Sequence, residues 1–403
     1  MKATMIDYTL SKCQKCLTCL KSCPTQAISL VNDRVEINND RCIACSKCIG
    51  ACTSAGLKNK SSDLKYLNDF DYNVLLLPTA IYSDCAHEQE AANLLEILQG
   101  FGFDEVIDIS DISGAMYQES IKYVDKYNDK CRITSFCPVI NRLIEVKYPM
   151  LIDMLLPFEY PLEVAAKRVR KRLSARNQKI GIFSLCECVG NLTLAKHPYD
   201  NKDSNIDYAL SIAELFPKIF SKMREAYQDD TQKSVSICRE GLCSIISDYY
   251  KEKQGKEDLL AITGFDKVER VLELAEFDNL HSIRLLSLYA CASGCIGGHF
   301  LWGNPFVGRI HMERFLKLAD KPCADLSFEE IYKEHSELLS ETKISMKEKL
   351  QYFKKVNQVL EDLPGYDCGA CGLASCRMMS EEIIQGRRTI KDCAVLKGEV
   401  KNK

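Results

Sequence analysis

Cysteines are the residues in this sequence whose type and spacing most clearly suit chemistry. The chain has 403 residues and 22 cysteines, and many of these cysteines are only two or three residues apart. Thiolates at such spacing are soft ligands that suit zinc or iron–sulfur clusters. A disulfide framework is typical of small secreted proteins that lack a core. Because 46% of the residues are hydrophobic, this chain can build a core, and we expect reduced thiols available as metal ligands.

Two cysteine quartets near the N-terminus share one spacing. Residues 13–24 read CQKCLTCLKSCP and residues 42–52 read CIACSKCIGAC, so both follow C-x2-C-x2-C-x3-C. In tandem runs of this kind the fourth cysteine ligates the cluster of the other run. We therefore predict two [4Fe–4S] clusters, and zinc is the weaker alternative because zinc sites usually carry pairs of cysteines. The two predicted ligand sets are Cys13, Cys16, Cys19 and Cys52, and Cys42, Cys45, Cys48 and Cys23. This region resembles a bacterial two-cluster ferredoxin.

A third cysteine group lies near the C-terminus. Its spacing is C-x2-C-x4-C, and a fourth cysteine follows 17 residues later. A helix over 377–391 would return that fourth thiol to the others. We predict another [4Fe–4S] cluster, with zinc again as the alternative, on Cys368, Cys371, Cys376 and Cys393. The stretch resembles a small cluster domain found in electron-transfer complexes and in corrinoid iron–sulfur proteins.

The middle of the chain alternates between predicted strands and helices. The strand candidates are 74–77, 105–109, 179–185 and 282–290, and the helix candidates are 87–101, 205–228 and 265–277. This alternation predicts an α/β domain with mostly parallel sheets, in which ligands bind at the carboxyl ends of the strands. Three loops with cysteines occur where predicted strands end: the first carries Cys137, the second carries Cys186 and Cys188, and the third carries Cys291 and Cys295. These thiols are sufficient for one further cluster.

These three loops resemble the cluster-binding signatures of the [FeFe]-hydrogenase catalytic domain, and the chain is similar to the sensory members of that family. The likeness is carried by TS-x-C-P in the first loop and by AC-x2-GC-x-GG followed by NPFV in the third. It implies a ferredoxin-like domain (1–60), a hydrogenase-like α/β core (70–340), and a linker helix with a C-terminal cluster domain (341–403). It also implies four [4Fe–4S] clusters in total, the fourth with the ligands Cys137, Cys188, Cys291 and Cys295.

In that family one cysteine also bridges to a two-iron subcluster, and by position this catalytic cysteine is Cys295. Cys186 is the alternative to Cys188 in the second loop. Three positions depart from the family. Phe136 stands where efficient hydrogenases have a proton-relaying cysteine, Asn191 replaces a lysine that anchors the two-iron unit, and Ser287 replaces an acidic relay residue.

These departures leave two functional hypotheses. The first is a hydrogenase-type oxidoreductase, sensory or of low hydrogen activity, in which electrons pass through clusters to a divergent H-cluster-like site. The second is a protein with cubane clusters alone that transfers electrons or senses redox state without activating hydrogen. Glu187 and His299 are candidate proton donors in the first case, and a packing role is the alternative for His299.

The remaining thiols have weaker patterns. Four residues lie between Cys238 and Cys243, and metal binding is one alternative for this pair. Cys85, Cys131 and Cys323 are isolated, as is typical of buried structural thiols.

Composition limits the choice of partners. The net charge of −3 gives no general attraction to nucleic acid, and no apolar run or signal peptide predicts a membrane or an export route. We therefore expect a cytoplasmic protein with a redox partner, either a ferredoxin or a flavoprotein. A sensory role would also require a separate signalling protein.

Overall fold

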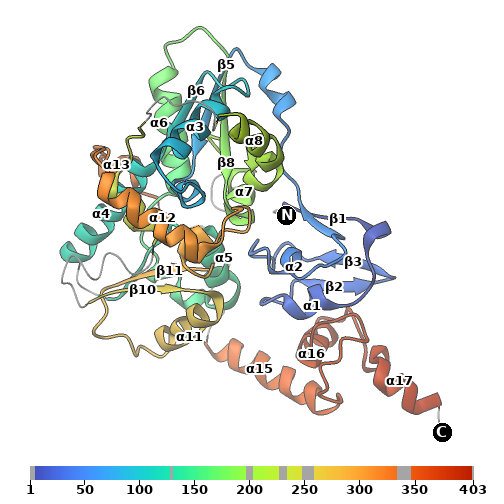
Figure 1. Cartoon of the computed structure of the whole chain (residues 1–403). Helices are drawn as coiled ribbons and strands as arrows, with labels where there is room; N and C mark the ends of the chain where they lie inside the picture. The colour runs from blue at the N-terminus through green and yellow to red at the C-terminus, as the bar shows by residue number, and fades with distance from the viewer. Residues whose placement is uncertain are drawn as a thin grey trace. The chain divides into compact units, whose positions relative to one another are not determined.

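The computed structural model describes residues 5–127, 130–196, 203–226, 234–246, 258–333 and 346–401. The chain divides into two compact units (Figure 1). Unit 1 combines Met1–Lys60 with Leu338–Lys403, and unit 2 is Ser61–Glu337. The two ends of the chain therefore belong to one unit, although they were predicted as separate domains.

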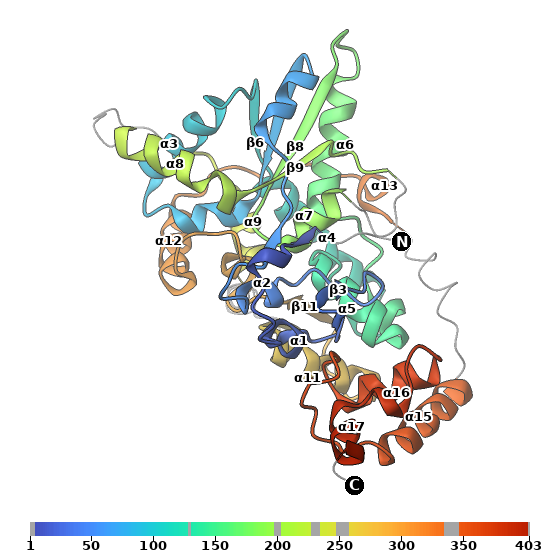
Figure 2. The same ribbon diagram turned by 90° about the vertical axis from the view of Figure 1, so that its right-hand side faces the viewer.

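Unit 1 is built from short strands and short helices. Its strands pair in two antiparallel ribbons, β1 with β4 and β2 with β3. These strands are β1 (Ile6–Tyr8), β2 (Ile28–Val31), β3 (Arg34–Ile37) and β4 (Leu57–Asn59). The helices are α1 (Thr18–Ser22), α2 (Lys47–Gly50), α15 (Met346–Glu361), α16 (Cys376–Ile384) and α17 (Ala394–Lys401). Helices α15 and α16 pack against each other (Figure 2).

The core of unit 1 is shared by both ends of the chain. Leu20 and Ile28 from the N-terminal part are buried together with Leu373 and Met379 from the C-terminal part. The backbone N–H of Leu30, in β2, also donates to a C-terminal carbonyl oxygen at 2.7 Å. A two-cluster module has little apolar core of its own, so this packing adds buried surface to both partners.

Unit 2 contains two parallel sheets. The strand order is β6-β5-β8-β9 in one sheet and β10-β11-β7 in the other. In the first sheet Val74 lies opposite Glu105 on one side and Ile182 on the other. The strands are β5 (Tyr72–Leu77), β6 (Glu105–Asp108), β7 (Arg132–Ile133), β8 (Ile180–Cys186), β9 (Tyr208–Ser211), β10 (Leu259–Thr263) and β11 (Leu285–Tyr289).

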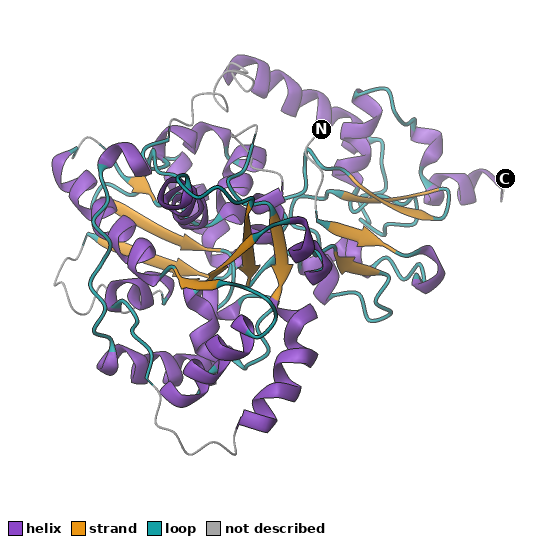
Figure 3. Ribbon diagram, turned by 90° about the horizontal axis from the view of Figure 1, so that it is seen from above, coloured by secondary structure: helices purple, strands orange, loops and turns teal. Residues whose placement is uncertain are grey.

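Helices surround these strands (Figure 3). The α-helices are α3 (Glu88–Gln99), α4 (Ser110–Lys126), α5 (Pro138–Lys147), α6 (Pro161–Leu173), α7 (Val189–Lys196), α8 (Ile212–Ala226), α9 (Arg239–Ile245), α11 (Phe265–Glu276), α12 (Pro305–Leu318) and α13 (Phe328–Ile331). Helices α5, α6 and α12 each begin with a proline, whose fixed φ and missing N–H suit the first helical turn. Because the buried strands run in parallel and are covered by helices, unit 2 is an α/β domain.

The predicted α/β class with parallel sheets is confirmed, and so are the four strand candidates. Two helix predictions were partly wrong. Residues 208–211 of the candidate 205–228 form strand β9, because pairing with β8 buries Ala209 and Leu210. The candidate 377–391 ends at Ile384, because Gly386 adopts a left-handed φ of 73° that a helix cannot continue. Among the described residues, no helix has the length and apolar character that crossing a membrane requires.

Candidate iron–sulfur cluster sites

The two N-terminal ligand loops have the same backbone shape. In the first loop Lys15 and Leu17 adopt left-handed φ values of 53° and 62°, and in the second Ala44 and Ser46 adopt 55° and 60°. These residues occupy equivalent places two and four positions after the first cysteine of each run. Left-handed residues at regular intervals curl a chain around a compact centre, and here they lie between successive thiols.

The thiols of these loops fall into two groups. Burial raises the pKa of Cys19 to about 11, and the neighbouring thiols of Cys52, Cys13 and Cys16 add to the rise. Burial likewise raises the pKa of Cys45 to about 12, with further contributions from Cys23 and Cys42. The fourth cysteine of each run therefore lies with the first three of the other run, which is the crossed arrangement that the tandem spacing predicts.

Hydrogen bonds support these thiols in a repeated pattern. The N–H of Ala27 donates to Sγ of Cys23 at 3.2 Å, and the N–H of Gly56 donates to Sγ of Cys52 at the same distance. A hydroxyl also lies near a ligand thiol in the first run, where Oγ1 of Thr18 is 3.3 Å from Sγ of Cys16. Donors aimed at sulfur stabilise the extra negative charge of a reduced cluster.

The C-terminal cysteines surround a small cavity of about 20 Å³. All four predicted ligands line it, and they are Cys368, Cys371, Cys376 and Cys393. Burial raises the pKa of Cys371, and the thiols of Cys393 and Cys368 raise it further. Lys21 holds the ligand loop from outside, since its ammonium donates to the carbonyl oxygens of Asp367 and Ala374, the latter at 2.8 Å. Four thiols that line one cavity are the set of ligands that a [4Fe–4S] cluster requires.

The central cysteines in unit 2 all follow the carboxyl ends of parallel strands. Cys137 follows β7 and begins α5, Cys188 follows β8 and precedes α7, and Cys291 and Cys295 follow β11. Parallel strands bring their carboxyl ends to the same edge of a sheet, which is where α/β proteins bind ligands. β7 and β11 are neighbours in one sheet, so the topology brings Cys137 to Cys291 and Cys295, whereas Cys188 follows β8 of the other sheet.

The second and third central loops are in close backbone contact. The N–H of Phe300 donates to the carbonyl oxygen of Glu187 at 2.9 Å. Within the third loop, a Cβ on Gly297 would lie only 2.0 Å from the carbonyl oxygen of Ala292. A side chain at this position would push the loop open, so the glycine permits the tight turn that presents Cys291 and Cys295.

The central thiols influence one another electrostatically. Burial raises the pKa of Cys188 well above its usual value, and Cys291 and Cys137 contribute after Glu187. Burial also raises the pKa of Cys295, with contributions from Cys137 and Cys291. All four predicted ligands therefore lie close together, and their buried thiols would need a metal to become thiolates.

The alternative ligand in the second loop occupies a different place. Cys186 is the last residue of β8 and is fully buried. Its Sγ lies 3.5 Å from the hydroxyl of Ser184 in the same strand. It packs within the sheet, whereas Cys188 interacts with the other loop thiols, so the structure favours Cys188 as the ligand of this loop.

A cavity of about 80 Å³ adjoins two of the central thiols, those of Cys137 and Cys295. Phe136, Glu187 and Asn191 also line it. The amide of Asn191 donates to Oε1 of Glu187 at 2.7 Å, while Oε2 of Glu187 is buried without a hydrogen-bond partner. Burial raises the pKa of this carboxyl to about 7. The cavity is thus mainly apolar, with one carboxyl group that can hold a proton near neutral pH.

Two other residues singled out in the sequence do not line this cavity. Ser287 is buried in β11, and its hydroxyl lies 3.5 Å from that of Tyr117. His299 is exposed next to the third loop. The wall contributed by Ser244 and Ile245 of α9 was not predicted, because no local pattern links that helix to the cysteine loops.

The remaining thiols are arranged differently from the expectation. Cys243 is buried in α9 and raises the pKa of Tyr117 in addition to burial. Cys238 instead lies beside Cys323, and the two Sγ atoms are 3.4 Å apart. Cys323 had been predicted to be an isolated structural thiol. Cys85 is fully buried, as expected, and Cys131 is half-buried.

Comparisons with known families agree with this arrangement. Residues 81–235 match the family "Iron only hydrogenase large subunit, C-terminal domain", residues 5–53 match "4Fe-4S dicluster domain", and residues 363–395 match "Putative Fe-S cluster". No curated protein matches the chain.

The chain is also similar to solved structures, two of which follow. One is the structure of HydA(deltaEFG), which reveals stepwise [FeFe]-hydrogenase H-cluster assembly. It is 13% identical to this chain, with a TM-score of 0.48, and the match covers 66% of this chain and 94% of that one. The other is a variant of [FeFe]-hydrogenase HydA1 from Chlamydomonas reinhardtii; it is 12% identical, with a TM-score of 0.47 over 67% of this chain and 97% of that one.

Proposed function

We propose that this chain, an [FeFe]-hydrogenase-like iron–sulfur protein with an N-terminal 4Fe-4S dicluster domain, is an electron-transfer oxidoreductase with a divergent H-cluster-like site. The observation that carries the proposal is the cavity beside Cys137 and Cys295, two of the four central thiols. A [4Fe–4S] cluster bound by these thiols would supply one-electron chemistry. The ligands of this cluster would be Cys137, Cys188, Cys291 and Cys295.

The residues around the cavity support such a role. The side chains of Phe136 and Tyr160 give it apolar walls that exclude water. The carboxyl of Glu187, with a pKa raised by burial to about 7, would hold a proton at Oε2, the oxygen without a hydrogen-bond partner. A proton held beside a cluster ligand is what a small molecule needs when it is reduced or oxidised there.

A second function is favoured by the contacts of Asn191. Its amide is hydrogen-bonded to Glu187 and brings no positive charge to the cavity. A cyanide-bearing two-iron unit would lack a charge-assisted anchor at this position. In this alternative the central site holds a cubane cluster alone, and the protein transfers electrons or senses redox state without activating hydrogen.

The other clusters fit an electron path. The crossed thiol sets of the N-terminal loops and the four C-terminal thiols would hold three further [4Fe–4S] clusters, which makes four in all. Electrons would enter from a redox partner, either a ferredoxin or a flavoprotein. In a sensory role a separate signalling protein would respond to the oxidation state.

Infrared spectroscopy after anaerobic maturation with the two-iron cofactor tests the proposal. Bands of metal-bound CO and cyanide, absent in Cys295→Ser and present in the matched control Cys131→Ser, are the expected result. Iron at about 16 per chain, which is four cubes of four irons, without such bands would favour the cubane-only alternative. An iron content of about 12 per chain in a folded protein would mean that the central thiols hold no cluster. This result would contradict both proposed functions.

A further inference from the structure

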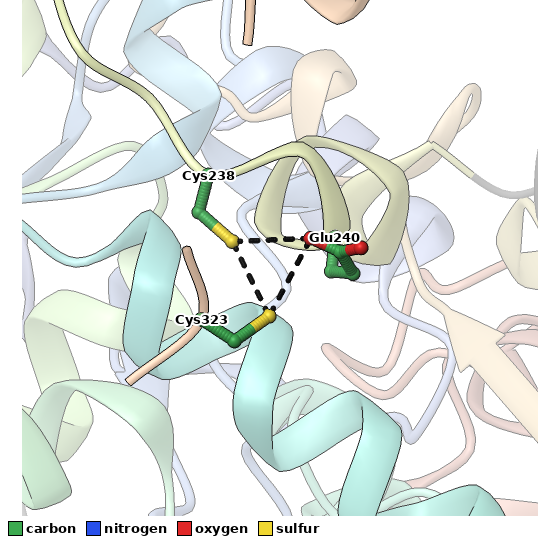
Figure 4. Close-up of side chains that lie close together, drawn as sticks. All are labelled: Cys238, Glu240 and Cys323. Atoms are coloured by element: carbon green, nitrogen blue, oxygen red, sulfur yellow. Dashed lines mark hydrogen bonds between the residues drawn. The ribbon is translucent and has the colours of Figure 1, made fainter. Parts of the chain in front are cut away.

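Three side chains with ligand-type atoms meet in unit 2, apart from the predicted clusters (Figure 4). They belong to Cys238, Glu240 and Cys323, and their ligand atoms all lie within 4.8 Å of one another. The two sulfur atoms are 3.4 Å apart, and Oε2 of Glu240 is 3.5 Å from each of them. Cys238 is fully buried, while the other two residues are half-buried, so one side of the group is open.

These separations are those of a tetrahedral metal site. Zinc binds thiolate sulfur at about 2.3 Å and carboxylate oxygen at about 2.0–2.2 Å. Tetrahedral angles then place two sulfur ligands about 3.8 Å apart and a sulfur and an oxygen about 3.5 Å apart. The observed 3.5 Å agrees with the second value, and the observed 3.4 Å between sulfurs differs from the first by a few tenths of an ångström.

The backbone holds both halves of the group in place. The N–H of Cys238 donates to the hydroxyl of Ser110 at 2.9 Å. On the other side, the N–H of Lys321 donates to the carbonyl oxygen of Ile237 at 3.2 Å, and the N–H of Ala324 donates to that of Asp111 at the same distance. Hydrogen bonds therefore flank Cys238 and Cys323, and the ligand atoms meet without a rearrangement of the chain.

Helix α9 is also pressed closely against α4 at this point. A Cβ on Gly241 would lie 2.0 Å from the carbonyl oxygen of Ser110, so only glycine allows this approach. The close approach fixes the start of α9, from which Glu240 projects. The opposite end of the same helix carries Ser244 and Ile245, which line the central cavity.

The charges around the group also suit a dication. Two thiols and one carboxylate are soft and hard donors of the kind that zinc accepts together. The ammonium of Lys321 is engaged with Asp111 at 3.2 Å and with Asp108 at 3.5 Å. A divalent cation would offset two of the three negative charges that the carboxylate and the two thiolates carry when it binds.

We propose that Cys238, Glu240 and Cys323 bind one Zn²⁺ ion, with water at the open fourth position. Binding releases the two thiol protons to solvent and forms two Zn–S bonds and one Zn–O bond. The ion fastens the segment that follows α12 to the start of α9. It thereby fixes the helix that forms one wall of the central cavity, whichever cluster that cavity adjoins.

Metal analysis and zinc-edge X-ray absorption of the anaerobic holoprotein, purified in the presence of zinc, test this site. We expect one zinc per chain with two sulfur neighbours at about 2.3 Å, since the site has two thiolates. Zinc should be lost in Cys323→Ser and retained in Cys131→Ser, the matched control at an isolated half-buried cysteine. Glu240→Gln keeps both thiols but replaces the carboxylate with a neutral amide. It should weaken zinc binding by about 10- to 100-fold, the loss that is usual even when a hydrogen-bond partner of a metal ligand is changed.

Three results would overturn the proposal. If the wild-type protein contains no zinc, or if the zinc content is equal in Cys323→Ser and Cys131→Ser, this group is not a metal site. A zinc spectrum with four sulfur neighbours would assign the metal to cluster cysteines instead. A Cys238–Cys323 disulfide in the anaerobic protein, seen by mass spectrometry in place of zinc, would identify a redox pair. Unchanged iron content in each variant shows that the chain has folded.

Discussion

The amide of Asn191 donates a hydrogen bond to the carboxyl of Glu187 at 2.7 Å, at the edge of a cavity that also touches Cys295. The two residues flank the ligand Cys188 in the sequence. The amide satisfies one carboxyl oxygen and leaves the other, Oε2, without a partner. Glu187 therefore brings a carboxyl group with an unsatisfied oxygen to this cavity, and Asn191 brings no charge.

Asn191→Lys should restore a cation to the central cavity. A charge-assisted contact is stronger than a neutral one by about 1.4 kcal/mol, so retention of the two-iron cofactor should rise about tenfold. The intensity of CO and cyanide infrared bands measures this retention. Asn191→Gln keeps a neutral amide and serves as the control. Equal intensity in the two variants would show that charge at this position does not limit binding of the cofactor.

Gly297→Ala should remove the central cluster while sparing the others. The added Cβ would lie 2.0 Å from the carbonyl oxygen of Ala292, so the loop that carries Cys291 and Cys295 must open. Iron content should fall by about four atoms per chain, the content of one cube. Gly398→Ala places its Cβ in open space within α17, and it should retain full iron. Full iron in both variants would contradict the role assigned to this tight turn.

Thr18→Val should lower the reduction potential of one N-terminal cluster. The Thr18 hydroxyl lies 3.3 Å from Sγ of Cys16 and lowers the pKa of that thiol. Losing an exposed hydrogen bond of about 0.5–1 kcal/mol corresponds to about 20–40 mV for a one-electron couple. Redox titration monitored by electron paramagnetic resonance measures the shift. Thr53→Val, at an exposed threonine beside Cys52, should leave the potential unchanged, and a similar shift in both variants would rule out this specific contact.

Lys21→Met should weaken the C-terminal cluster, although Lys21 lies in the N-terminal part of the chain. Its ammonium donates to the carbonyl oxygens of Asp367 and Ala374, on both sides of the C-terminal ligand loop. Removing it leaves these acceptors to water and loosens the loop by about 1–3 kcal/mol. Cluster loss on mild chelation should then be faster than in Lys12→Met, a control at an exposed lysine of the same region. Equal rates would show that the contact does not hold the loop.

The sequence predicted what depends on local spacing and periodicity. The strands β8 and β11, which precede the second and third cysteine loops, were predicted because their apolar runs are bounded by turns, and pairing in parallel sheets bears them out. The two-residue strand β7 before Cys137 was not predicted, because two residues carry no periodic pattern. Residues that meet only through the tertiary fold were not foreseen. Lys21 reaches Ala374 across the chain, and Cys323 reaches Cys238 over 85 positions. Likewise, the raised pKa of Glu187 depends on its burial in the folded chain, which the sequence of one segment does not show.

Asp84 should make the stability of unit 2 depend on pH. Its carboxylate accepts hydrogen bonds from the N–H groups of Trp302 and Gly303, at 3.0 Å and 2.9 Å, just beyond the third cluster loop. Burial nevertheless raises its pKa to about 6, above the usual value near 3.8. A carboxyl with a raised folded-state pKa favours the folded state when it is protonated, so its stabilising effect is lost as pH rises toward 6.

The total loss follows from a shift of about two pKa units, each of which corresponds to 1.36 kcal/mol. Roughly half of this stability is already lost below pH 5, so the loss between pH 5 and 7 amounts to about 1 kcal/mol. Asp84→Asn cannot ionise, so its melting temperature relative to wild type should be higher at pH 7 than at pH 5. Loss of one acceptor oxygen lowers the stability of this variant at both pH values, which is why the change with pH is the measurement that decides. Asp325→Asn, at an exposed aspartate, should show no such change. A difference in melting temperature between wild type and Asp84→Asn that stays constant from pH 5 to 7 would contradict this prediction. It would mean that Asp84 keeps its ordinary pKa, because its two hydrogen bonds outweigh the cost of burying its charge.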